Sequence, residues 1–309
     1  MTVKLRVGLC GLVLCGVSGC FQSGDEATEY DVGRVSFREA VEISGISASR
    51  QQANVIWAHN DSGDSARVFA MNAEGQHLGQ YHLKSVVAED WEDITIQGGH
   101  SGQSYLFIGD IGDNFGRRDF VTIYRIKEPV VHQEKAQQDK EIITLADVGS
   151  IQVQYPDQAR DAEALMYDPW DDALYILTKR EERPLLYRVS AGNKPLMWSG
   201  ERVEAELVAR LPSPTGGYPR DKVVAADISA DGQDVLVKTY QRMLYWRRKP
   251  KQSLAEVLLT APTYVPYVEE KQGESVAWSG QGYITTSEGF QQRIRLYPDP
   301  STGGSSKNK

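Results

Sequence analysis

The chain has 309 residues, and its 42 acidic side chains outnumber its 34 lysines and arginines, which gives a formal net charge of −8. Because nucleic acid is held mainly by basic side chains on its phosphates, this balance argues against DNA or RNA as a partner. The sequence has no glycine-rich phosphate loop leading from a strand into a helix, so it predicts no nucleotide site.

The first 19 residues have the form of an export signal. Lys4 and Arg6 precede an apolar run over residues 7–17, which is too short for a membrane-spanning helix of about 20 residues. The next four residues, Val17-Ser18-Gly19-Cys20, resemble the lipobox of bacterial lipoproteins. This resemblance implies cleavage after residue 19 and lipid on Cys20. An ordinary cleaved signal is the alternative.

Cysteine usage agrees with a lipoprotein. The three cysteines are Cys10, Cys15 and Cys20, so the mature chain keeps one thiol, which lipidation consumes, and we expect no disulfide. The lipoprotein resemblance implies the membrane as a partner. With Phe21 rather than aspartate after the cysteine, it also implies the outer membrane if the host is Gram-negative. Residues 20–31 are expected to form the lipidated cysteine and its tether.

Beyond the tether, one sequence unit recurs five times. Each copy begins with a short motif and continues with two further strand-like runs separated by turn residues, which is typical of an all-β repeat fold. The five motifs are Glu42–Ile46, Asp90–Ile94, Asp161–Leu165, Val224–Ile228 and Gln272–Val276. Four antiparallel strands per copy, arranged around an axis, make a β-propeller, whereas a β-sandwich gives no reason for the repeat.

Five blades are favoured for the propeller, with residues 32–299 as the domain and residues 300–309 as a disordered tail. The fifth copy lacks a fourth strand, and the early stretch Gly33–Arg38 is expected to supply it and close the ring. Fourth strands are expected at Glu204–Leu211 and Leu254–Thr260 for the third and fourth copies. Six blades stay possible because the connection over Val130–Gln158 is hard to assign.

Three motifs resemble those of uncharacterised bacterial envelope propellers: His59–Asp64, Asp90–Ile94 and Gly109–Asn114. The resemblance covers most of the mature chain, implies the propeller fold and brings no activity with it. The layout is also similar, more distantly, to calcium-dependent propellers of the phytase and lactonase kind, a likeness of architecture alone.

Propeller topology gathers polar residues at one face of the ring. The start of each inner strand meets the end of the second strand there, so the following residues are expected around the axis: Asn60, Asp61, Asp90, Trp91, Glu92, Asp110, Asp161, Glu163, Lys179, Glu274 and Glu288. Carboxylates crowded together repel one another unless a hard cation, protonation or basic neighbours offset their charge. Calcium suits such a site best, with Glu92, Glu163, Glu274, Asp61 and Asp110 as candidate ligands.

Two simpler interpretations stand beside the calcium site. Lysines such as Lys179 lie next to the acids, so a salt-bridged channel that locks the blades together is equally compatible with the sequence. The two Asp-x-Gly-Asp segments, Asp61–Asp64 and Asp110–Asp113, lack the longer acidic pattern of an EF-hand loop, and they favour tight turns over metal binding.

Catalytic residues are sparse in the sequence. A Gly-x-Ser-x-Gly elbow is missing, and the histidines lack zinc-ligand spacing. His59, at the end of an inner strand, is the one candidate base, although a hydrogen-bonded wall residue is the commoner role for such a histidine. Trp91 either packs in the core or offers an aromatic platform to a ligand.

Two functions follow from these features. The first is a lipid-anchored envelope module whose acidic face binds a small ligand or a partner protein. The alternative is a divalent-metal-dependent hydrolase of phosphate esters or lactones, with calcium as the candidate cofactor and His59 or a carboxylate as the base.

Overall fold

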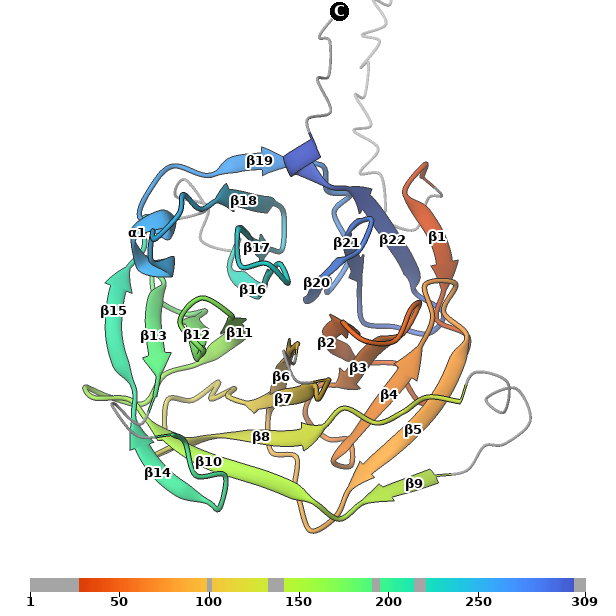
Figure 1. Cartoon of the computed structure of the whole chain (residues 1–309), viewed down its shortest axis with the longest axis horizontal. Helices are drawn as coiled ribbons and strands as arrows, with labels where there is room; N and C mark the ends of the chain where they lie inside the picture. The colour runs from red at the N-terminus through yellow and green to blue at the C-terminus, as the bar shows by residue number, and fades with distance from the viewer. Residues whose placement is uncertain (1–27, 99–101, 133–141, 191–194, 214–220, 303–309) are drawn as a thin grey trace, which may run out of the picture.

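The computed structural model describes residues 28–98, 102–132, 142–190, 195–213 and 221–302. The molecule is a five-bladed β-propeller, with five sheets arranged around a central axis (Figure 1). The proposed lipidation site Cys20 and the export signal lie outside these residues. Within the described residues, the structure contains no helix with the length and hydropathy needed to cross a bilayer.

Each blade carries its innermost strand at the axis, and the strands follow one another outwards. In blades 1 and 2 the antiparallel strands are β2 (Ile43–Ala48), β3 (Ile56–Asn60), β4 (Arg67–Met71) and β5 (His77–Leu83), then β6 (Trp91–Gln97), β7 (Tyr105–Asp110), β8 (Val121–Lys127) and β10 (Val148–Gln154). In blade 3 they are β11 (Ala162–Asp168), β12 (Ala173–Thr178), β13 (Leu185–Val189) and β15 (Glu206–Arg210). Inner strands such as β11 and β12 are buried along their whole length, as expected of strands covered on both faces.

Blades 4 and 5 complete the ring. Blade 4 contains β16 (Val223–Ile228), β17 (Asp234–Thr239), β18 (Met243–Arg247) and β19 (Thr263–Val265). Blade 5 contains β20 (Ser275–Ser279), β21 (Gly282–Thr286), β22 (Arg293–Pro298) and the amino-terminal strand β1 (Asp31–Arg34). The short helix η1 (Pro300–Thr302) follows, so the first residues of the predicted disordered tail are ordered.

The amino-terminal strand closes the ring, as the sequence predicted, although it starts and ends earlier than Gly33–Arg38. β1 pairs antiparallel with β22. The carboxylate of Asp31 accepts hydrogen bonds from Arg293 Nη1 at 2.5 Å and lies 3.1 Å from Arg295 Nε. Because Arg295 is buried and also pairs with the buried Glu270, the closure joins the two ends of the chain through desolvated charges.

Removing β1 should therefore destabilise the whole ring. A chain that begins at residue 36 should lose roughly 3 kcal/mol or more of unfolding free energy, because Arg293 and Arg295 lose their shared carboxylate and β22 loses its outer partner strand. Urea unfolding of this chain measures the loss against a control that begins at residue 28. Equal stability of the two chains would show that the closure contributes nothing.

Two further strands lie at the outer edges and settle the number of blades. β9 (Ile142–Leu145) pairs in parallel with β5 of blade 1, and β14 (Glu201–Glu204) pairs in parallel with β10 of blade 2. Both come from connections within the following blade, so each reaches back to the previous sheet. The connection over residues 130–158 thus supplies an edge strand and the fourth strand of blade 2, rather than a sixth blade.

One predicted strand is wrong. Leu254–Thr260, expected as the outer strand of blade 4, contains instead the helix α1 (Leu254–Leu258), and β19 takes the place of that strand. Ser253 caps the helix and forms a reciprocal capping box with Glu256. Leu254, Val257 and Leu258 have helical spacing, and they pack into the core between blades 3 and 4.

The apolar core is divided into five clusters, each filling the space between two neighbouring blades. Buried carboxylates join inner strands at the axis. Asp93 accepts a hydrogen bond from the backbone N–H of Leu165 in the next blade, and Asp227 accepts one from Trp278. The inner strands are therefore held at fixed spacing, which makes the axial face a rigid support for a site.

Candidate functional site: an axial carboxylate cluster

At one face of the ring, a residue one or two positions after the second strand of each blade hydrogen-bonds to the residue that begins the repeated motif. The N–H of Asp61 donates to the carbonyl of Glu42 at 2.8 Å, and Lys179 donates to Asp161 at 3.0 Å. The same contact joins Glu288 to Gln272 at 3.0 Å. Backbone geometry therefore sets the side chains of two strands per blade next to one another at the axis.

The fourth copy of the motif is displaced from its predicted position. In blade 4, the N–H of Tyr240 donates to the carbonyl of Lys222, and Val223 pairs with Thr239 as Ala162 pairs with Thr178 in blade 3. The motif therefore begins at Lys222 rather than at Val224. Tyr240 then occupies the position that Asp61, Lys179 and Glu288 hold in other blades.

Seven carboxylates meet at this face, and we call them the axial carboxylate cluster: Asp61, Asp90, Glu92, Asp161, Glu163, Glu274 and Glu288. They form three overlapping groups, in each of which one oxygen per residue lies within 4.8 Å of the others: Asp61, Asp90 and Glu92; Asp61, Glu274 and Glu288; Glu92, Asp161 and Glu163. Asp61 and Glu92 belong to two groups each, so the cluster is continuous. All seven were among the residues predicted to gather here.

Burial and mutual repulsion raise the pKa of these acids. Burial, opposed by Lys179 and reinforced by Glu274, raises the pKa of Glu163 to about 8. Burial and the neighbouring Glu274 raise the pKa of Glu288 to about 8 as well. For Asp90, burial and the charges of Asp61 and Asp161 raise the pKa to about 6. The cluster therefore holds groups that gain or lose protons near neutral pH.

Two of the buried acids lack hydrogen-bond partners for part of their carboxylate. Oε2 of Glu163 is buried and accepts no hydrogen bond from the described residues. Glu92 as a whole residue is 3% exposed, and its carboxylate accepts no hydrogen bond from the described residues; burial together with Glu163 raises its pKa well above the usual value. A buried anionic oxygen without a partner is costly, so these atoms have unused capacity for a ligand.

Lys179 and Tyr240 balance part of the negative charge. Lys179 Nζ lies 2.5 Å from Glu163 Oε1, 3.9 Å from Glu274 Oε1 and 5.5 Å from the ring centre of Tyr240. The phenol of Tyr240 donates a hydrogen bond to Glu274. Arg180 pairs with Asp161 from the outer side. Neither Tyr240 nor Arg180 was predicted, and a correct alignment of the fourth copy would have indicated Tyr240.

The ion pair of Lys179 and Glu163 is not symmetrical. Burial alone would lower the pKa of Lys179, but the charges of Glu163, Tyr240 and Glu274 outweigh it and raise the pKa, so the ammonium stays charged. The pKa of Glu163 is nevertheless raised, because burial and Glu274 outweigh this one cation. Lys179 is therefore a permanent charge, whereas Glu163 exchanges its proton near neutral pH.

Other predicted site residues stabilise the surrounding turns. Asp110 accepts hydrogen bonds from the N–H groups of Glu89 and Asp90 and pairs with Arg118 at 2.8 Å. Its carboxylate belongs to none of the three groups. Asn60 donates to Glu39 and to Asp64. These contacts agree with the turn interpretation of the Asp-x-Gly-Asp segments.

Asp64 and Asp113 have similar contacts in the two turns. Asp64 pairs with Arg67, and Asp113 accepts the N–H groups of Arg117 and Arg118. In each segment the final aspartate therefore stabilises the turn. Within the part of the chain that the structure describes, the carboxylate of Asp61 accepts a hydrogen bond only from the adjacent N–H of Ser62, which leaves one of its oxygens for the cluster.

The two aromatic candidates lie in the core, away from the cluster. Trp91 is 1% exposed and packs edge to face against His59, with ring centres 5.6 Å apart, within the core between blades 1 and 2. Nδ1 of His59 hydrogen-bonds the carbonyl of Asn60, and burial lowers the pKa of this histidine to about 4. Trp91 thus offers no platform to a ligand, and His59 is a neutral wall residue.

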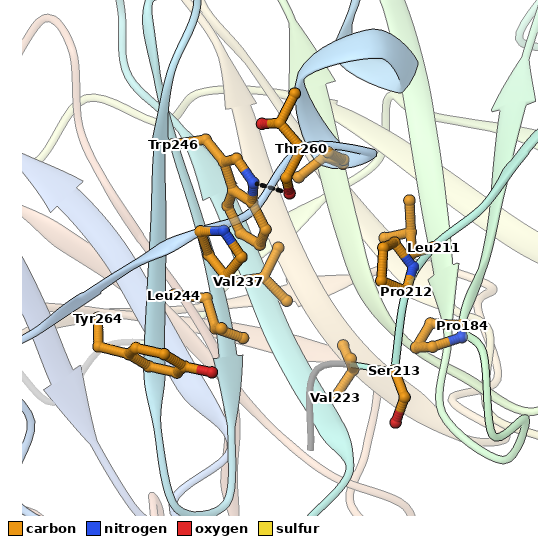
Figure 2. Close-up of a pocket in the computed structure, with 12 residues that line it drawn as sticks. Pro184, Leu211, Pro212, Ser213, Val223, Val237, Leu244, Trp246, Thr260 and Tyr264 are labelled. Carbon is orange, nitrogen blue, oxygen red and sulfur yellow. Dashed lines mark hydrogen bonds between the residues drawn. The ribbon is translucent and has the colours of Figure 1, made fainter. Parts of the chain in front are cut away.

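A separate cavity of about 70 Å³ lies near the periphery, between blades 3 and 4. Figure 2 shows its mostly apolar lining, including Leu211, Pro212, Val237, Leu244 and Trp246. The indole N–H of Trp246 donates to the carbonyl of Thr260, so it is not free for a ligand. With no titratable group except Tyr264, this cavity lacks the chemistry of the axial carboxylate cluster.

Comparison with known proteins gives structural similarity without close relatives. No protein-family model and no curated protein match the sequence. A calcium-binding regucalcin from Agrobacterium tumefaciens has a TM-score of 0.43, with 87% of this chain and 94% of that chain covered. A luciferin-regenerating enzyme has a TM-score of 0.41 with 84% and 94% covered, and a gluconolactonase from Xanthomonas campestris has 0.41 with 82% and 72% covered. Sequence identity is 10% in each case.

Proposed function

We propose that the protein is a divalent-cation-dependent hydrolase of small esters, with its site at the axial carboxylate cluster. One observation carries the proposal: seven carboxylates form one continuous cluster of three overlapping groups, and Glu163, a member of it, has a buried oxygen without a hydrogen-bond partner among the described residues.

The cluster fits a hard cation. Its donors are all carboxylate oxygens, which Ca²⁺ prefers, and three of them converge within 4.8 Å in each group. Glu92 is the best placed ligand because it belongs to two groups and its carboxylate is free of hydrogen bonds from the described residues. Asp61 and Asp90 would hold the cation on one side of Glu92, and Glu163 on the other. Asp161 is less available because Arg180 already pairs with it.

The neighbouring side chains supply proton transfer and orientation. A bound divalent cation would polarise an ester carbonyl or phosphoryl oxygen. Glu288 is not among the proposed cation ligands, and burial with the neighbouring Glu274 raises its pKa to about 8, so it is the group best placed to act as a general acid or base near neutral pH. Tyr240, which donates its phenolic hydrogen to Glu274, offers a second polar contact at the same face.

Elemental analysis of the purified mature protein, combined with hydrolysis assays, tests the proposal. The probes are p-nitrophenyl phosphate, p-nitrophenyl acetate and a δ-lactone, each with EDTA, Ca²⁺, Mg²⁺ or Mn²⁺. Cation-dependent hydrolysis of one probe that Glu92→Gln abolishes is the expected result. Absence of bound divalent metal together with no hydrolysis under any condition would refute the proposal.

Gly112 gives a steric test of the same site. A Cβ atom at this position would lie 2.2 Å from Glu92 Oε1 and 2.5 Å from Asp90 Oδ2, so Gly112→Ala must displace both carboxylates. Calcium affinity, measured by titration calorimetry, should fall roughly tenfold because cation sites depend on ligand position. Gly280→Ala, where a Cβ atom meets nothing within 4 Å, is the matched control. Equal affinities would place the cation elsewhere.

A second candidate function is the envelope-binding module. The observation that favours it is the ion pair of Lys179 with Glu163, which fills part of the site and leaves no evident nucleophile. In this case the acidic face captures a ligand or partner protein without turnover. Glu92→Gln and Glu163→Gln should then abolish capture of an envelope partner without unfolding the protein, and capture by both variants would exclude it.

Attachment to a membrane through Cys20 is proposed alongside either function. It is supported by the lipobox-like Val17-Ser18-Gly19-Cys20 and by the lack of any other cysteine after it. Metabolic labelling with palmitate should mark the wild type but not Cys20→Ala, and the variant should leave the membrane fraction. Equal labelling of both would rule out this anchor.

A further inference from the structure

Lys179 occupies a central position that its role in the fold does not require. Its backbone N–H already joins β12 to the motif residue Asp161, and its side chain is largely buried among the acids. The ammonium lies between Glu163 at 2.5 Å and Glu274 at 3.9 Å, on the face of the Tyr240 ring. It is therefore held by contacts on both sides.

The charge of Lys179 acts on all three groups of the cluster. It opposes the effect of burial on Asp61, which is in two groups, on Glu92, which is in two, and on Glu163. Arg180 is different, because it pairs with Asp161 from the solvent side with half of its side chain exposed. Lys179 is thus the counter-ion that the groups share.

A divalent cation and this ammonium compete for the same oxygens. Two cations at ordinary ligand spacing in a partly desolvated site repel strongly. We propose that Lys179 is an internal counter-ion which a divalent cation displaces from Glu163, so that binding is an exchange of charges. This inference rests on the proposed function. On its other side, the ammonium of Lys179 already contacts Glu274 and the Tyr240 ring. When a cation displaces it from Glu163, the ammonium therefore moves towards these two groups.

The exchange sets the affinity of the site. Removing Lys179 should strengthen cation binding, because no internal charge then has to leave. If Lys179 were only structural, the same substitution would leave the affinity unchanged or would weaken it. The direction of the change therefore separates the two roles.

Titration calorimetry with CaCl₂ on the full mature chain tests the exchange. Lys179→Met should raise calcium affinity about tenfold. Lys222→Met is the matched control: it removes the same charge from the same face, but among the described residues Lys222 Nζ bonds only the carbonyl of Arg180, at 3.5 Å, so its effect should stay below about threefold. Unchanged or weaker binding by Lys179→Met, with calcium binding intact in the wild type, would overturn the exchange. No binding by either protein would refute the proposed function itself.

A second measurement covers the case in which Lys179→Met fails to fold. Acetylation of the wild-type protein by an N-hydroxysuccinimide ester, read by mass spectrometry, reports how accessible each lysine is. Modification of Lys179 should rise at least about threefold when Ca²⁺ is added, because the amine loses the ion pair with Glu163 that keeps it protonated, while that of the exposed Lys84 stays constant. Equal modification of Lys179 with and without Ca²⁺ would contradict displacement.

Discussion

Raising the pH from 6.5 to 8.5 should destabilise the cation-free protein by roughly 2 kcal/mol. The cause is Glu163, whose pKa burial and Glu274 raise to about 8, against a usual value of 4.5. The folded state therefore keeps a proton that the unfolded state has already lost. Unfolding releases this proton throughout the window, so stability falls as pH rises by up to about 1.4 kcal/mol per unit until the folded pKa is passed.

Between pH 6.5 and 8.5, two other groups with shifted pKa values have completed most of their titration. His59 has a pKa of about 4 in the fold, lowered by burial from 6.5, so it makes stability rise with pH, but only below 6.5. Asp90, at about 6, completes most of its titration below the window. Glu288 shifts in the same direction as Glu163 and adds to the slope, with a smaller effect because it is only half-buried.

Urea unfolding in EDTA at pH 6.5, 7.5 and 8.5 measures the effect. Glu163→Gln should flatten the profile, because the amide does not titrate. Glu89→Gln is the control, since Glu89 is exposed and lies outside the cluster, and it should keep the wild-type slope. A wild-type slope in Glu163→Gln would mean that another group dominates.

The fold followed from the sequence because a repeated pattern constrains it in five places at once. Runs such as Leu174–Leu177 and Leu185–Val189 are buried strands in the structure, and the closure by an early strand followed from the unfilled place in the fifth copy. The register of the fourth copy did not follow, because Val223-Val224-Ala225-Ala226 is uniformly apolar and fits two alignments. The pairing of β16 with β17 and the bond between Tyr240 and Lys222 decide between them.

The helix α1 was predictable in principle. Ser253 and Glu256 have the spacing of a capping box, and Leu254, Val257 and Leu258 have helical spacing. The repeat pattern, which predicts a fourth strand in every blade, conflicts with this capping box and helical spacing. β19, with two of its three residues exposed, has almost no hydrophobic pattern, and pairing with β18 specifies it instead.

The sequence also predicts one part of the candidate site and not another. Propeller topology alone brought the seven acids together, since inner strands must meet at the axis. Topology does not show which carboxylates have other partners. Asp110 and Asp61 occupy similar positions in the sequence, yet Arg118 and two N–H groups hold the first while the second faces the cluster. The difference is one of strand register: Asp110 pairs with Trp91 as Asn60 pairs with Ile43, so Asp61 lies one residue further along, an offset that one sequence does not reveal.

Calcium at about 100 times its dissociation constant should stabilise the protein by roughly 2.7 kcal/mol, which corresponds to a rise of about 5–10 °C in Tm. The reason is that the cation binds the assembled cluster, whereas the unfolded chain lacks it. Differential scanning calorimetry at pH 7.5, with EDTA or CaCl₂, measures the shift. Because repulsion within the cluster is then relieved, the pH dependence of the loaded protein should also be shallower.

Glu92→Gln separates this effect from a general loss of structure. The buried Glu92 carboxylate has a pKa held high by burial and by Glu163, so it is repelled in the cation-free protein. In EDTA, the Tm of the Glu92→Gln variant should equal or exceed that of the wild type. Calcium should not change the Tm of this variant. Glu89→Gln should keep the full shift. A calcium shift retained by Glu92→Gln would mean that the cation binds elsewhere. No shift in the wild type would mean that basic neighbours such as Lys179 and Arg180, rather than calcium, offset the charge of the cluster.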